Sequence, residues 1–207
     1  LAHVFQNLGV DQIISGGQTM NPSTQDILEA VNKVPAETVF VLPNNKNIIM
    51  AAQQCVGMAE GKDIVVLQTK TVPQGIAALF AYDPDADAAA NTEAMTESFQ
   101  AVKTLSVTYA ARDSVFDGHQ IKQGQFLGLV DGRVAKVDES LESCIASITE
   151  ESVAGEESYV NVFYGEGIKE EDAENISNIV KSKLPQGAEV NVVYGGQPVY
   201  YYIISVE

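Results

Sequence analysis

The chain has 207 residues, enough for one large domain or two small ones, and 45% of its residues are apolar. Acidic residues number 28 against 12 basic ones, so the formal net charge is −16. Binding to nucleic acid or to an anionic membrane surface requires a basic patch, and this balance argues against both partners. No apolar run reaches 18 residues, so we expect no membrane insertion. The acidic excess serves either solubility or the docking of a basic protein partner.

The first half of the chain alternates predicted strands with predicted helices. Short apolar runs predict strands at residues 11–15, 38–42 and 63–69. Helical periodicity predicts helices at residues 23–34, 45–59, 74–82 and 86–102. Near-continuous apolar strands separated by helices are typical of a parallel sheet covered on both faces. We therefore expect residues 1–102 to form an α/β lobe with a parallel, Rossmann-like sheet.

The second half of the chain favours an α+β lobe over residues 103–207, with a largely antiparallel sheet. Alternating patterns predict strands at residues 104–111, 125–130, 133–137, 159–165, 188–196 and 198–207, and helices at 138–151 and 170–184. Asp131 and Gly132 predict a tight hairpin turn. In the first helix, Asp138 is the expected N-cap, and Leu141, Ile145 and Ile148 should form one buried face.

The two cysteines, Cys55 and Cys144, are far apart in the sequence and lie on the apolar stripes of predicted helices. Free, buried thiols are the usual state of cysteines at such positions. This pattern fits a reducing compartment, so we expect a cytoplasmic protein.

Polar residues without acids follow each of the three strands predicted in the first half. The carboxyl ends of parallel strands meet at one edge of a sheet, where ligands commonly bind. Helix N-termini at that edge favour an anion such as a carboxylate or phosphate. Asn21 or Ser23 is expected to cap the first of these helices, and Asn44 or Asn45 the next. The candidate ligand-binding residues here are Gly17, Thr19, Asn21, Asn44, Asn45 and Lys46. The alternative is that each loop is only a turn.

A second glycine pair, Gly195 and Gly196, lies between the last two predicted strands. These glycines either close a hairpin or form a backbone nest that binds an anion. We include both among the candidate ligand-binding residues.

No catalytic centre is expected in this segment. Only two histidines occur, His3 and His119, and His119 lies in the turn-rich stretch "FDGHQIKQG", where we expect it to face solvent. The sequence contains no G-x-S-x-G elbow, no H-E-x-x-H pair, no phosphate-binding loop and no zinc-ligand spacing. We therefore expect no metal and no cofactor here, and an independent hydrolase is the least favoured alternative.

Four stretches carry a family resemblance: "DQIISGGQTMNPSTQDIL", "VFVLPNNKNIIMAAQQ", "YAARDSVFDGHQIKQGQFLGLVDG" and "VNVVYGGQPVYYYIISVE". Together they resemble the C-terminal region of the catalytic subunit of bacterial fatty acid kinase, which is a dihydroxyacetone-kinase-like protein. That region is in turn similar to the DegV family, whose members bind fatty acids between two α/β lobes. In those relatives a Thr-Ser-Gln-Pro stretch holds the carboxylate, and Thr19-Met20-Asn21-Pro22 matches it here with Met20 in place of a hydroxyl.

The resemblance implies a role in lipid metabolism and phospholipid synthesis. This segment would be the non-catalytic end of an ATP-dependent fatty acid kinase, and it would engage a DegV-type fatty-acid-binding carrier. ATP and magnesium are then expected only at a separate N-terminal domain, and self-association would run through other domains. The alternative is a binding domain for a fatty acid or another small anion, with its site between the lobes.

Overall fold

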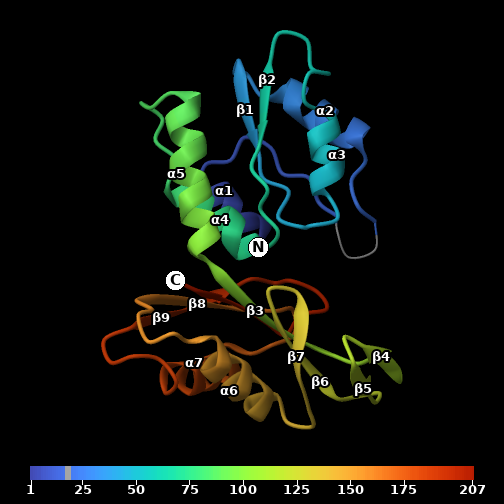
Figure 1. The fold of residues 1–207 in the computed structure, drawn as a ribbon, viewed down its shortest axis with the longest axis vertical. Coiled ribbons are helices and arrows are strands. Elements are labelled where there is room, and N and C mark those ends of the chain that lie inside the picture. The colour runs from blue at the N-terminus through green and yellow to red at the C-terminus, as the bar shows by residue number, and fades with distance from the viewer. Residues whose placement is uncertain (17–19) are drawn as a thin grey trace. The chain divides into compact units, whose positions relative to one another are not determined.

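The computed structural model describes residues 1–16 and 20–207. It divides into two compact units, which we call the N-terminal unit (Ala2–Ala101) and the C-terminal unit (Val102–Glu207, together with Leu1) (Figure 1). The sequence-based expectation placed the boundary between residues 102 and 103. Two predicted site residues, Gly17 and Thr19, lie outside the described residues.

The N-terminal unit stacks helices on both faces of a parallel pair of strands. Its elements are α1 (Ala2–Asn7), α2 (Thr24–Lys33), β1 (Thr38–Val41), α3 (Ile49–Gln54), β2 (Asp63–Val66), α4 (Val72–Phe80) and α5 (Ala88–Ala101). The parallel register pairs Val39 with Ile64. Side chains of α2 and α3 pack on the Val39 face of this sheet, and those of α4 and α5 pack on the other face, around Met95 and Phe99.

One predicted strand of this unit is absent. Residues 11–15 are described but form no strand, and the Ile13 and Ile14 side chains are each 39% exposed. The apolar run is short, and a strand exists only where a neighbour accepts its backbone hydrogen bonds, which local pattern cannot supply. The parallel sheet therefore has two strands within the described residues, where three were expected.

The C-terminal unit contains a mixed six-stranded sheet in the order β7-β6-β3-β10-β8-β9. Its elements are β3 (Lys103–Tyr109), β4 (Ser114–Phe116), β5 (His119–Ile121), β6 (Phe126–Val130), β7 (Arg133–Asp138), α6 (Leu141–Ser152), β8 (Tyr159–Tyr164), α7 (Glu170–Lys181), β9 (Glu189–Tyr194) and β10 (Tyr202–Val206). β4 and β5 pair as a separate hairpin. The expected hairpin at Asp131 and Gly132 is confirmed, and both residues have the positive φ angles (49° and 80°) that a tight hairpin turn requires.

The last two strands do not form the hairpin that the sequence suggested. β8 lies between β9 and β10, pairing parallel with β9 and antiparallel with β10. The backbone N–H groups of Gly195 and Gly196 both donate to the Tyr164 carbonyl at the end of β8, at 2.9 and 3.1 Å. The chain therefore crosses the end of β8 after β9 and continues on its other side. β8, α7 and β9 form a β-α-β unit, which local turn chemistry did not reveal.

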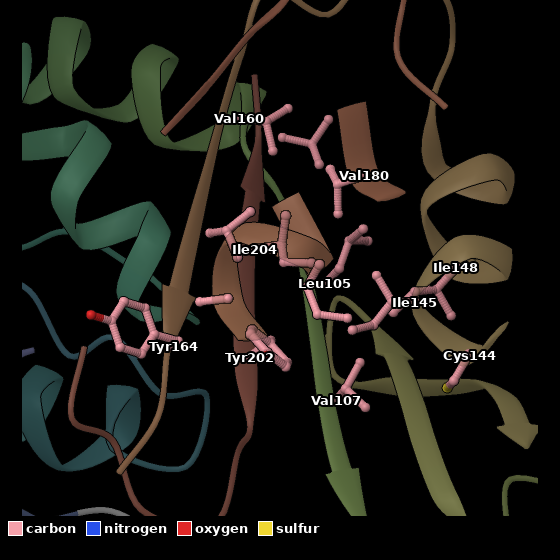
Figure 2. Close-up of a cluster of buried hydrophobic side chains, with 14 residues drawn as sticks. Leu105, Val107, Cys144, Ile145, Ile148, Val160, Tyr164, Val180, Tyr202 and Ile204 are labelled. Atoms are coloured by element: carbon pink, nitrogen blue, oxygen red, sulfur yellow. The ribbon is translucent and has the colours of Figure 1, made fainter. Parts of the chain in front are cut away.

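The core of the C-terminal unit lies between the sheet and helices α6 and α7 (Figure 2). Ile145 and Ile148 are fully buried, and Leu141 is partly buried against the same cluster, so the predicted helix face is confirmed. Ser140, not Asp138, is the N-cap of α6, and its hydroxyl accepts from the Ser143 N–H at 3.2 Å. Asp138 instead accepts from the backbone N–H of Ser140 and the hydroxyl of Ser143.

Both thiols are free and buried, as expected. Burial raises the pKa of Cys55, and burial with the nearby negative charge of Asp138 raises the pKa of Cys144 to about 11. Among the described residues, no helix is both long and apolar enough to cross a membrane.

Candidate functional site

The candidate site of the N-terminal unit is built where β1 and β2 end side by side. Asn44 follows β1, and Thr69 follows β2. The Asn44 N–H donates to the Thr69 hydroxyl oxygen at 3.0 Å, and that hydroxyl donates to the Asn44 side-chain oxygen at 2.8 Å. Thr69 is fully buried, so these two hydrogen bonds fix the orientation of the Asn44 side chain.

The Asn44 side chain also packs closely against Gly75, near the start of α4. A Cβ atom at Gly75 would lie 2.1 Å from the Asn44 side-chain oxygen, so only glycine admits this close approach. Asn44 itself has a left-handed φ of 55°, which asparagine tolerates better than most residues. The side chain is thus held by β1, β2 and α4 together.

The loop after Asn44 continues as a turn before α3 begins. The Asn45 side-chain oxygen accepts from the Asn47 N–H at 2.9 Å, and the Asn45 carbonyl accepts from the Ile48 N–H at 3.0 Å. The N-cap of α3 is Ile48, which has no side-chain cap, so the expectation that Asn44 or Asn45 caps this helix was wrong. Lys46 is exposed and forms no ion pair within residues 1–16 and 20–207.

The helix after β2 begins with its own cap beside this loop. The Thr71 hydroxyl accepts from the Gln74 N–H at 3.3 Å, and the Gln74 side-chain oxygen accepts from the Lys70 N–H at 2.7 Å. A proline occupies one of the first two positions of α4, where its missing N–H costs nothing. The positive end of the α4 dipole therefore lies at the same end of the sheet as Asn44.

Asn21 is exposed and does not cap α2. The second option holds: the Ser23 hydroxyl accepts from the Asp26 N–H at 3.2 Å, and the Asp26 carboxylate accepts from the Ser23 N–H at 2.7 Å. This capping box satisfies the first N–H groups of α2 and lowers the pKa of Asp26, chiefly through its hydrogen bonds from Ser23.

Gly195 and Gly196 belong to the C-terminal unit, and their N–H groups are already bound to the Tyr164 carbonyl. Beside them, Gln197 is 7% exposed and donates from its amide nitrogen to the Phe163 carbonyl at 3.0 Å. Its side-chain oxygen packs on Gly195, where a Cβ would lie only 1.9 Å away. The pair therefore lets Gln197 pack closely and offers no free N–H groups as an anion nest.

The strand ends combine paired polar groups with a nearby cation. Asn44 and Thr69 hydrogen-bond to each other, and the Thr71 hydroxyl accepts from the Gln74 N–H at the start of α4. Lys46 is exposed in the loop that follows Asn44. His119 lies in β5 of the other unit, partly exposed. Within the described part of the chain, no group of three or more histidine, cysteine, aspartate or glutamate side chains is placed to hold a metal ion.

Sequence reasoning missed the residues that position Asn44. Thr69 was part of a polar strand end, but nothing local marked it as buried. Gly75 looked like an ordinary helix residue, although a glycine inside a helix carries a cost of about 1 kcal/mol and so signals a close approach.

The chain is similar to known proteins in sequence and in fold. Protein YloV of Bacillus subtilis is 41% identical over 207 residues, which is all of this chain and 37% of that protein. A DegV family protein of Corynebacterium glutamicum has a similar fold, with a TM-score of 0.70 at 13% identity, covering 100% of this chain and 92% of that one. The fatty acid kinase (Fak) B3 protein of Streptococcus pneumoniae, solved with linoleic acid, gives 0.61 at 13% identity, covering 90% and 76%.

The fold is thus an α/β fold with a mixed sheet, of the DegV type. The chain spans little more than a third of the length of the curated relatives it matches. The family of FakA-like C-terminal regions, named for fatty acid kinase, matches residues 1–207. The chain therefore belongs to the FakA-like C-terminal family of fatty acid kinase.

Proposed function

We propose that this chain is the non-catalytic C-terminal region of the large protein of a fatty acid kinase and that it engages a DegV-type fatty-acid-binding carrier. A separate ATP-binding domain of the same protein would then phosphorylate the acyl carboxylate that the carrier presents. The observation that carries this proposal is the match of the whole chain, residues 1–207, to the FakA-like family. The DegV-like fold adds to it, because the Fak B3 protein that shares this fold was solved with a fatty acid bound.

In this proposal the chain binds the carrier, and a separate domain carries out phosphoryl transfer. ATP and magnesium belong, in the proposal, to the separate domain, and the protein works in the cytoplasm. The N-terminal unit would be a Rossmann-like lobe, since helices cover its parallel strands. It would have kept the fold of a lipid carrier, while Met20 replaces a hydroxyl of the matching carboxylate-binding stretch.

Titration calorimetry of the 207-residue chain against Fak B3 of S. pneumoniae, with and without ATP, tests the proposal. We expect heat from the carrier and none from ATP. Heat from ATP without heat from the carrier would contradict the proposal.

A second candidate is supported by the fixed Asn44 side chain and the adjacent Lys46. Together with the start of α4, they offer donors and a positive charge to a small anion at the strand ends. Under this alternative, native mass spectrometry of the purified chain would detect a bound fatty acid or phosphate. The variant Asn44→Ala would lose that ligand, whereas Asn47→Ala, in the same loop, would retain it.

A further inference from the structure

The segment between β3 and β6, residues 110–125, leaves the main sheet and returns to it as the β4–β5 hairpin. We call this segment the β4–β5 excursion (Figure 1). At its base, the Ala110 N–H donates to the Gln125 carbonyl at 2.8 Å, and the Gly124 N–H donates to the Ala110 carbonyl at 2.8 Å. At its tip, Asp117 and Gly118 have positive φ angles of 49° and 81° and close the turn.

Contacts inside the excursion and to β7 hold it in place. The Asp117 carboxylate accepts from the Val134 N–H of β7 at 3.2 Å. Within the excursion, the Asp113 carboxylate accepts from the Gln123 N–H at 2.7 Å. The Ile121 side chain is 3% exposed. An isolated two-stranded hairpin is marginally stable, so these contacts supply the order that it lacks alone. The excursion therefore presents its outer residues without a large ordering cost on binding.

The excursion exposes two large apolar side chains, Val115 and Phe116, that add nothing to the buried core of the unit. Val115 is 72% exposed and Phe116 is 55% exposed, on a strand whose every residue is exposed. The hairpin is tied to the edge strand β7 by the Asp117 carboxylate, which accepts from the Val134 N–H, and the buried side chain of the hairpin is Ile121. Neither feature uses the Val115 or Phe116 side chain. An exposed apolar pair on an anchored strand is typical of a binding surface.

The charged residues in and beside the excursion indicate which kind of partner surface it can bind. Arg112, Lys122 and Arg133, the last beside the tip at the start of β7, are exposed and form no ion pair with a described residue. The two aspartates of the excursion are turned toward backbone N–H groups. No glutamate occurs from residue 98 to residue 138 in this strongly acidic chain. Aromatic residues and arginine with few glutamates are the composition of protein–protein interface centres.

We infer that the β4–β5 excursion is a docking element for the fatty-acid-binding carrier, inserting Val115 and Phe116 into an apolar recess bordered by carboxylates. This inference rests on the proposed function and adds to it the surface that makes the contact. We expect carboxylates on the carrier because Arg112, Lys122 and Arg133 are exposed and form no ion pair with a described residue. A membrane is the less favourable occupant, because a chain of net charge −16 is repelled by anionic lipid. A second copy of this chain carries the same net charge and is disfavoured for the same reason.

Binding kinetics of the 207-residue chain with Fak B3 of S. pneumoniae test the inference. The double variant Val115→Ser/Phe116→Ser should raise Kd at least about tenfold, mainly through faster dissociation. Arg112→Gln should slow association by about two- to fivefold and weaken its salt dependence. The matched control is Met50→Ser/Phe80→Ser, which removes two side chains that are 70% and 74% exposed in the N-terminal unit, and it should leave Kd unchanged. Circular dichroism establishes that all variants are folded.

Hydrogen exchange of the unaltered chain gives a readout that needs no variant. Amides of residues 111–122 should be protected when Fak B3 is added. If the unaltered chain binds but the excursion variants bind equally well and no protection is seen there, the docking inference fails and the proposed function stands. Absence of any binding by the unaltered chain would overturn the proposed function itself. Self-association, or flotation with phosphatidylglycerol vesicles, that the double variant abolishes would overturn the choice of occupant.

Discussion

Replacing Ile145 by alanine tests the packing of the C-terminal unit directly. Ile145 is fully buried on α6 among Leu105, Ile148 and the strands of the sheet (Figure 2). The change removes three carbon groups, each worth about 0.8 kcal/mol of transfer free energy, so about 2.4 kcal/mol is the least expected loss. The cavity left behind adds to this, because helix and sheet relax only in part, and substitutions of this type cost about 2–5 kcal/mol. We expect a decrease of about 3–4 kcal/mol in the free energy of unfolding.

Urea unfolding followed by far-UV circular dichroism measures the loss, since the chain has no tryptophan. Hydrogen exchange assigns it: amides of β3 and β10 should lose protection, and amides of α2 in the other unit should not. Val115→Ala, which truncates a 72% exposed side chain, is the control and should cost less than about 0.5 kcal/mol. A loss below about 0.5 kcal/mol for Ile145→Ala would refute the assignment of this helix face to the core.

Three further outcomes follow from the structure. Gly128→Ala should destabilise the C-terminal unit by about 1–3 kcal/mol in urea unfolding, because its Cβ would lie 2.6 Å from Ile148 Cγ2; a stabilised variant, as strand propensity alone predicts, would contradict this. In the folded chain at pH 8, Cys144 should resist Ellman's reagent, because a pKa of about 11 leaves about one thiol in a thousand ionised; rapid modification would disprove its burial. Because the pKa of Asp26 lies below its ordinary value of 3.8, the capping box should stabilise α2 fully above that pH and lose its contribution as the pH falls through the lowered pKa. The difference in urea midpoint between the unaltered chain and Ser23→Ala should shrink accordingly between pH 6 and pH 3; a constant difference would show that the carboxylate contributes nothing.

Local signals in the sequence determined most of the elements and several of their ends. The apolar spacing of Ile145 and Ile148 located the buried face of α6, and Ser23 with Asp26 was one of two candidate starts of α2, the one that the structure confirms. The Asp131-Gly132 turn was equally readable, because left-handed φ angles restrict which residues can occupy a tight hairpin. These features depend on residues within a few positions of one another, so a single sequence contains the information that defines them.

Long-range pairing was decided only by the tertiary structure. Gly195 and Gly196 suited a hairpin, yet the Tyr164 carbonyl, distant in sequence, binds both N–H groups and directs the chain across β8. Residues 11–15 had the composition of a strand, but they pair with no strand of the described residues. At the candidate site, the predicted polar ends of β1 and β2 do meet, but the fixed orientation of Asn44 comes from a buried hydroxyl and a glycine on other elements. Hydrogen-bond partners that are far apart in the sequence leave no periodic or local pattern, so only the folded chain reveals which groups they satisfy.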